Sequence, residues 1–227
     1  MLDFLPRLDY NKRAEMIGDA KDRRDIAAFC IFFYTPEVRK MLTFHELTEI
    51  LDRSPVIAAI HDADFEAALA SPCEVLFHLK ASILTVSQRV EEAHRNGKRI
   101  FIHLDLASGV GKDKAGGEFL AKCGVEGIIS TRGQLLRFGK ECGLLTVQRF
   151  FALDSRGIDS INEMLESSDP DLIELMPGVI GKVIRRFSAG KIPVIAGGLM
   201  ETKAEVTEAI SCGAAAISTS AKNLWYS

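Results

Sequence analysis

From Pro55 onward the chain alternates short apolar runs with amphipathic stretches, and this alternation restricts the fold more than any other feature. The runs are almost continuously apolar, which is typical of parallel strands that helices cover on both faces. Gly, Asp or Ser residues mark the junctions. Eight runs are present, at residues 56–61, 74–79, 99–104, 127–130, 144–150, 172–175, 194–196 and 214–218.

Eight such units predict an α/β fold, a closed (β/α)8 barrel of the TIM type with eight parallel strands, because a doubly wound open sheet usually needs fewer strands. Helical patterns fill the intervals. In residues 83–96, Ile83, Val86 and Val90 share one face, and Gly97 follows as a stop. We expect Gly124, Gly143, Gly190 and Gly213 to end other helices in the same way. After the eighth run and the Ser-Thr-Ser motif at 218–220 only residues 221–227 remain, so we expect something other than a full helix to cover that side.

The domain prediction is a single barrel over residues 41–227, opened by a helical pattern that carries Leu42, Leu47, Ile50 and Leu51. Residues 1–40 form an amino-terminal extension of different texture, charged over 2–24 and apolar over 26–34. One interpretation is a helix and a strand that pack on the barrel or on a second subunit. The other is a start-site extension without a role.

Charge and cysteine content exclude several classes of protein. A formal net charge of -3 excludes a globally basic protein that coats nucleic acid, although a local basic patch remains compatible with it. The 5 cysteines are odd in number and form no C-x-x-C pair, which argues against a zinc ribbon or a disulfide framework and favours the reducing cytoplasm. No apolar run is long enough to span a membrane. We expect no metal and no cofactor, and we leave open whether the protein forms a homo-oligomer.

Two glycine- and hydroxyl-rich loops are the sharpest local signal. Functional groups of such barrels lie at the carboxyl ends of the strands, and the loops after strands seven and eight often hold phosphate. Here Gly197 and Gly198 follow the seventh run, while Ser218, Thr219 and Ser220 close the eighth, ahead of an expected helix. Taken singly these motifs could be a tight turn and an N-cap cluster. Their combination at these two strands favours an anion-binding corner.

Charged residues also follow several strands. Asp105, Arg149 and Glu174 come after runs three, five and six, where an isolated charge is costly unless it is paired or bound to a ligand. They form either a structural ion-pair layer or part of a binding site. Lys80 follows run two and could complement an anion or, in an aldolase-like enzyme, act as an amine nucleophile. We expect His61, His78 and His103 to be satisfied core groups, with hydrogen-bond partners inside the protein, rather than catalysts or ligands.

With these loops assigned, the chain resembles the glycerol uptake operon antiterminator regulatory family, from Met41 to about Tyr226. The stretches that carry the resemblance are Pro-Val-Ile-Ala-Ala-Ile at 55–60, His-Leu-Asp-Leu at 103–106, Gly-Ile-Ile-Ser-Thr-Arg at 127–132, Gln-Arg-Phe-Phe-Ala-Leu-Asp-Ser at 148–155, Ile-Glu-Leu-Met-Pro-Gly at 173–178, Pro-Val-Ile-Ala-Gly-Gly-Leu at 193–199 and Ser-Thr-Ser at 218–220. The resemblance implies a non-catalytic sensor that binds glycerol-3-phosphate in the barrel mouth and acts on the leader mRNA of glycerol genes.

The predicted ligand-binding set is Lys80, Asp105, Arg149, Glu174, Pro177, Gly178, Gly197, Gly198, Ser218, Thr219 and Ser220, with no catalytic residue. The alternative function is a sugar-phosphate isomerase or aldolase-like enzyme that would use Lys80, Asp105 and Glu174, since fold alone does not decide between them.

A near-neutral protein can bind RNA only through a local cationic cluster, and three are available. One is Arg132 with Arg137 and Lys140, the second is Lys182 with Arg185, Arg186 and Lys191, and the third spans Lys12 to Arg24. Each is more often a solvated helix face than an RNA site. The second cluster has few acids between its cations in the sequence, so we expect Lys182, Arg185 and Arg186 to form the RNA-binding edge, with Arg132 as a further candidate.

Overall fold

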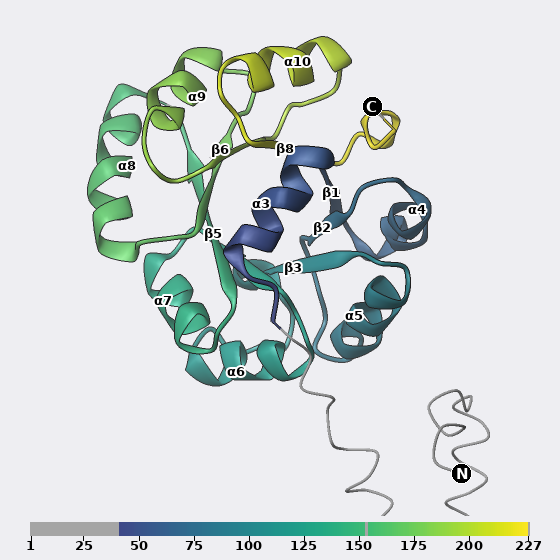
Figure 1. Cartoon of the computed structure of the whole chain (residues 1–227). Helices are drawn as coiled ribbons and strands as arrows, with labels where there is room; N and C mark the ends of the chain where they lie inside the picture. Colours follow the sequence, from purple (N-terminus) through teal and green to yellow (C-terminus); the bar gives the residue numbers. More distant parts are fainter. Residues whose placement is uncertain (1–40, 153, 227) are drawn as a thin grey trace, which may run out of the picture. The chain divides into compact units, whose positions relative to one another are not determined.

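Eight parallel strands pair in chain order, and β8 pairs with β1, so the sheet closes into a barrel (Figure 1). The computed structural model describes residues 41–152 and 154–226; the expectations for residues 1–40, including the cluster from Lys12 to Arg24, lie outside these residues. The strands are β1 (Val56–Ile60), β2 (Val75–His78), β3 (Arg99–His103), β4 (Gly127–Ser130), β5 (Leu145–Phe151), β6 (Leu172–Met176), β7 (Val194–Gly197) and β8 (Ala216–Thr219). The predicted (β/α)8 barrel is confirmed, and each strand falls within one or two residues of its predicted limits.

Helices surround the barrel and follow the strands in order (Figure 1). They are α4 (Phe65–Ala70), α5 (Val86–Arg95), α6 (Lys114–Lys122), α7 (Gly133–Glu141), α8 (Ser155–Ser168), α9 (Gly181–Ser188) and α10 (Lys203–Ser211), with the short 3-10 helices η2 (Asp62–Asp64), η3 (Leu104–Leu106) and η4 (Lys222–Leu224). No helix in the described part of the chain is both long and apolar enough to cross a membrane.

Two details of the helix prediction are wrong. The helix α5 starts at Val86 and not at residue 83, because the Ile83 N–H donates to the Ser108 carbonyl of the next loop, 2.9 Å away. Ile83 is therefore half-exposed rather than part of the apolar helix face. Gly97, Gly124, Gly143 and Gly213 follow their helices in the left-handed conformation, as expected of a C′ stop, but Gly190 has no positive φ.

A helix before the first strand closes the amino-terminal end of the barrel. The helix α3 (Phe44–Arg53) begins with a capping box between Thr43 and Glu46 and lies across one end of the barrel (Figure 1). Its Leu47, Ile50 and Leu51 belong to the same apolar cluster as the residues that point into the barrel. Those residues are Ile57, Ala59, Val75, Phe77, Phe101, Ile129, Leu145, Val147, Leu172, Ile195 and Ala216. The amino-terminal half of the interior is thus filled, and a ligand must enter from the other end.

The segment after β8 covers the side that has no eighth helix. Trp225 is only 2% exposed, and its indole Nε1 donates to the Thr219 carbonyl at 2.9 Å. Its own carbonyl accepts from the Cys73 thiol at 3.5 Å, while Lys222 pairs with Asp64 at 2.7 Å, which ties the segment to the elements after β1. A buried indole therefore occupies the place where a helix would pack.

Replacing Trp225 with Ala should destabilise the protein by about 3–5 kcal/mol, because it removes a large buried side chain and leaves a cavity. The midpoint and slope of urea denaturation measure this loss. Tyr226→Ala is the matched control, since Tyr226 is 62% exposed and its truncation should change stability by less than about 0.5 kcal/mol. Equal losses for both variants would show that the carboxyl-terminal segment does not close the barrel.

Candidate ligand-binding site

A pocket of about 590 Å³ opens at the carboxyl ends of the strands, opposite α3. This volume suits a small ligand. Of the predicted ligand-binding residues, Arg149, Glu174, Gly198, Ser218, Thr219 and Ser220 line it. The remaining lining residues are Ala59, Leu79, Met176, Leu199, Met200, Glu201, Ala221 and Asn223. Six predicted residues from strands β5 to β8 and their loops thus meet at one place.

The centre of the pocket is a buried ion pair. Arg149 and Glu174 are register partners on β5 and β6, and the Arg149 Nε donates to Glu174 Oε2 at 2.6 Å. Glu174 is fully buried, and Ser218 donates its hydroxyl to the other carboxylate oxygen, Oε1, at 2.5 Å. Removing one partner of such a pair would leave an uncompensated buried charge. Within the described residues Arg149 donates only through Nε, which leaves its two terminal nitrogens available to a ligand.

Gly197 is required by this cluster. A Cβ atom at this position would lie 2.5 Å from Glu174 Oε1 and 2.9 Å from the Ser218 hydroxyl, both too close. The next residue, Gly198, adopts the left-handed conformation with φ +72°, and a Cβ there would also meet Met176. Gly197 therefore allows Glu174 and Ser218 to lie close to the backbone, and Gly198 allows a tight turn. These are structural roles, the alternative to phosphate binding that the sequence left open.

The hydroxyl groups of Ser218 and Thr219, at the end of β8, are already hydrogen-bonded. Thr219 donates to the Met200 carbonyl at 2.7 Å and accepts from the Ala221 N–H at 3.0 Å, while Ser218 binds Glu174. Ser220 is exposed at the pocket wall. In the described residues no α-helix follows this motif; the 3-10 helix η4 begins at Lys222, in agreement with the expectation that the last unit is incomplete. The anion-binding capacity of this corner thus rests on backbone N–H groups and Ser220.

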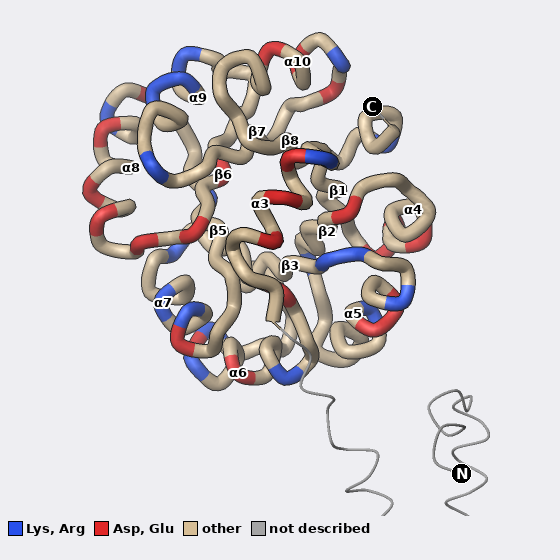
Figure 2. The backbone as a smooth tube through the Cα atoms, viewed as in Figure 1, with Lys and Arg blue, Asp and Glu red and all other residues tan. Residues whose placement is uncertain are grey.

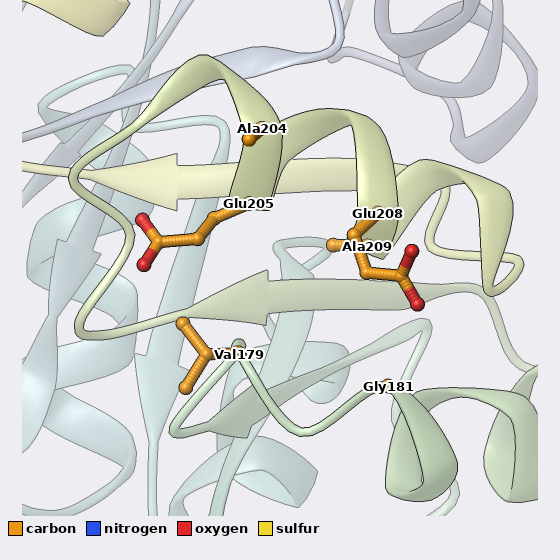
Figure 3. A pocket seen from close by; sticks show the side chains of 7 residues that line it. Val179, Gly181, Ala204, Glu205, Glu208 and Ala209 are labelled. Atoms are coloured by element: carbon orange, nitrogen blue, oxygen red, sulfur yellow. The ribbon is translucent and has the colours of Figure 1, made fainter.

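Five predicted residues do not line the pocket: Gly197, described above, and four residues from other loops. Lys80 is exposed beyond β2, and Pro177 follows a cis peptide bond after Met176. Gly178 donates its N–H to the Gly197 carbonyl at 2.6 Å and lines a separate hollow of about 260 Å³ between the loop after β6 and α10. Figure 3 shows Glu205 and Glu208 of α10 across that hollow from Val179.

Asp105, the fourth, lies in η3 and is bound to the loop after β4. It accepts from the Thr131 N–H and from the Arg132 Nε, each at 2.8 Å. Burial raises the pKa of Asp105, but the hydrogen bonds from Thr131 and Arg132 lower it by more. The pKa of this carboxyl therefore lies below its usual value. Its charge is therefore matched within the protein.

One buried histidine, His103, contradicts the interpretation that these histidines are satisfied core groups, because neither of its ring nitrogens has a hydrogen bond within the described residues. His78 Nε2 lies 3.1 Å from Asp62 Oδ1, so this buried ring is paired with a carboxylate. Burial, followed by the nearby Arg149 charge, lowers the pKa of His103 to about 4. His61 is exposed. No group of three or more His, Cys, Asp or Glu side chains in the described chain could hold a metal ion.

The sequence did not single out Glu201 and Asn223, which also line the pocket. Both lie a few residues past the Gly-Gly and Ser-Thr-Ser motifs, and Asn223 Nδ2 lies 3.4 Å from the Glu201 carbonyl. Their proximity to those motifs was the available signal, but their entry into the pocket depends on the path of η4.

The cationic candidates for RNA binding are largely paired with acids. Arg185 lies 3.5 Å from Glu208 of α10, Arg186 lies 2.8 Å from Asp159 of α8, and Arg132 is held by Asp105. Figure 2 shows the same mixture of blue and red over α8, α9 and α10. Acids of neighbouring helices therefore face the α9 cluster, although no acid separates its cations in the sequence. Lys182 is exposed.

A sequence profile described as glycerol-3-phosphate responsive antiterminator matches residues 56–225. The chain belongs to this family. It is 34% identical over 183 residues to an uncharacterised Escherichia coli (strain K12) protein, YgcP. The aligned region covers 79% of this chain and 95% of YgcP.

Two solved structures of family members are similar to the barrel. The glycerol uptake operon antiterminator regulatory protein of Listeria monocytogenes matches with a TM-score of 0.72 and 34% identity, over 77% of this chain and 95% of that one. A glycerol uptake operon antiterminator-related protein of Thermotoga maritima matches with a TM-score of 0.69 and 34% identity, over 76% of this chain and 98% of that one. The resemblance drawn from the ordered motifs is thereby confirmed.

Gly197→Ala should disrupt the pocket, because the added methyl group must displace Glu174 or Ser218 from their hydrogen bond. We expect a loss of about 1–3 kcal/mol in the free energy of unfolding, measured by urea denaturation. Gly157→Ala in α8 is the control, since a Cβ there meets no atom closer than 3.4 Å. A Gly197→Ala protein as stable as the control would mean that the cluster tolerates a side chain.

Proposed function

We propose that this protein is a glycerol-3-phosphate-responsive antiterminator that acts on the leader mRNA of glycerol-utilisation genes in the cytoplasm, as a ligand sensor and not as an enzyme. The observation that carries the proposal is the pocket at the carboxyl ends of the strands, where Arg149 and Glu174 meet the glycine and hydroxyl loops in a chain of this family. The response of this family to glycerol-3-phosphate indicates the ligand, and the pocket has groups that suit both ends of that molecule.

The phosphate of the ligand would lie against the backbone of Gly197, Gly198, Thr219 and Ser220, at the ends of the paired strands β7 and β8. The terminal nitrogens of Arg149 supply a positive charge in the same pocket, and guanidinium groups bind phosphate through parallel hydrogen bonds. The Glu174 carboxylate accepts hydrogen bonds and suits the glycerol hydroxyls. Ser218 would act beside it.

Gly197 is absent from the pocket lining and is included only as the neighbour of Gly198 in the turn. Lys80, Asp105, Pro177 and Gly178 also lie outside the lining and receive no direct ligand contact in this proposal. The Gly178 N–H instead donates to the carbonyl of Gly197, so the loop after β6 holds the glycine turn in place. Asp105 connects the loops after β3 and β4 through Thr131 and Arg132.

Two observations favour a sensor over the aldolase-like alternative. Among the described residues that line the pocket there is no lysine, the side chain that forms a Schiff base with a carbonyl substrate. The one buried carboxylate among the described residues that line the pocket, Glu174, already accepts hydrogen bonds on both oxygens, from Arg149 and from Ser218.

Glu174→Gln should weaken glycerol-3-phosphate binding at least about tenfold, because a neutral amide replaces a charged acceptor and alters the pairing of Arg149. Isothermal titration calorimetry of the full chain measures the affinity, and circular dichroism checks that the variant is folded. Glu163→Gln, at an exposed position of α8, is the control. An unchanged affinity for Glu174→Gln would remove this residue from the site.

Fluorescence anisotropy of a labelled glycerol-operon leader RNA, with and without glycerol-3-phosphate, tests the proposed RNA binding. We expect the ligand to change the leader affinity several-fold and a scrambled RNA to show no such change, because coupling requires one ligand to favour a state that binds the other. Equal affinities with and without ligand would contradict the proposed regulation.

The edge formed by Lys182, Arg185 and Arg186 remains the proposed RNA surface. Changing Arg185 and Arg186 to Glu should lower leader affinity and flatten its dependence on salt, since each lost phosphate contact removes counterion release. Lys203→Glu, on α10, is the control. An unaltered salt slope would exclude this edge and direct attention to Arg132 and residues 1–40.

A further inference from the structure

The pocket at the carboxyl ends of the strands has an excess of negative charge in its lining. Among the described residues that line it, the charged side chains are Arg149, Glu174 and Glu201. Arg149 and Glu174 form the buried ion pair, with 2.6 Å between Nε and Oε2, so their charges offset each other. The Glu201 carboxylate forms no hydrogen bond or ion pair within the described residues. The lining therefore carries one uncompensated negative charge.

The backbone of Glu201 is held in place, whereas its side chain is free. The Glu201 N–H donates to Glu205 Oε2 of α10 at 2.9 Å, and the Glu201 carbonyl accepts from Asn223 Nδ2 at 3.4 Å. The preceding residue, Met200, is buried, and its carbonyl accepts from Thr219. Glu201 itself is exposed. The structure thus fixes the position of Glu201 at the pocket wall and leaves its carboxylate to the solvent that fills the pocket.

An unpaired carboxylate opposes the binding of a phosphorylated ligand, because like charges repel over the few ångströms of a small pocket. The start of α10 offers a structural explanation, since Thr202 is the N-cap of this helix and a negative charge near a helix N-terminus is stabilising. Glu205 already fills that role, because its carboxylate accepts from the N–H groups of Glu201 and Thr202. The helix terminus therefore has its acid without Glu201.

We propose that Glu201 restricts the total charge of the ligand: the site admits a phosphate ester with a neutral polyol end and disfavours compounds that carry a carboxylate or a second phosphate as well. Binding sites obtain specificity by repelling wrong ligands as well as by attracting the right one. A single phosphate has the Arg149 guanidinium and backbone N–H groups to offset the repulsion, whereas the described lining has no further cation for a second acid group. This assignment rests on the proposed function and deepens it.

The test compares calorimetric affinities of the full chain for glycerol-3-phosphate and for the 3-phosphoglycerate of the same configuration, in which a carboxylate replaces the hydroxymethyl group. The wild-type protein should prefer glycerol-3-phosphate. Glu201→Gln should reduce this preference at least about threefold, mainly by strengthening 3-phosphoglycerate binding, and the effect should shrink at high salt because salt screens exposed charges. Glu201→Asp, which keeps the charge, should retain the preference. Glu163→Gln, at an exposed position of α8, is the control.

Two results would overturn the assignment: equal affinities of the wild-type protein for the two compounds, or an unchanged preference in Glu201→Gln. Thermal denaturation identifies the structural alternative, since a role at the α10 terminus predicts a lower melting temperature for Glu201→Gln with no change in the preference. A wild-type protein that binds neither compound contradicts the proposed function and this assignment with it. Binding of glycerol-3-phosphate with no effect of Glu201→Gln on the preference contradicts the assignment alone.

Discussion

Closing eight parallel strands into a barrel creates an interior that side chains must fill, and this constraint determines what each end of the protein can do. At the amino-terminal end, the apolar residues of alternate strand positions and the face of α3 pack together and leave no room for a ligand. At the carboxyl end the inward positions become polar, with Arg149, Glu174 and Ser218 in place of Phe, Ile and Leu. The pocket exists because the packing changes in chemical character along the barrel axis.

The polar end is stable because its charges are matched within the protein. Glu174 has both carboxylate oxygens bound, and Asp105 is held by the loop that follows the neighbouring strand. Lys112 donates to the Leu104 and Ala107 carbonyls, which fastens the loop after β3. Among the described residues at this end, the terminal nitrogens of Arg149 and the ring of His103 are left without a protein hydrogen-bond partner. A preorganised site of this kind pays little to reorganise when a ligand binds.

Membership of the antiterminator family and the geometry of the pocket address different questions. The family gives the class of ligand to which such proteins respond, and the pocket identifies the groups that could distinguish that ligand from similar anions. The cationic helix edges are weaker candidates for RNA binding, because acids on neighbouring helices pair with Arg185 and Arg186. Surface ion pairs of this type contribute little and exchange readily with other partners, so a phosphate backbone could compete for these arginines.

The sequence by itself determined the barrel, the ends of its strands and the family, because continuous apolar runs, glycine stops and ordered motifs are local properties of the chain. It also placed Arg149, Glu174, Gly198 and Ser218 to Ser220 at strand ends, and a closed parallel sheet brings all strand ends to one face. It could not separate Lys80 and Asp105 from the pocket, since that depends on loop paths. Only the tertiary structure decided which charges are paired, that Trp225 replaces a helix, and that His103 is buried without a partner. These outcomes depend on contacts between residues distant in the sequence, and no local pattern encodes such a contact.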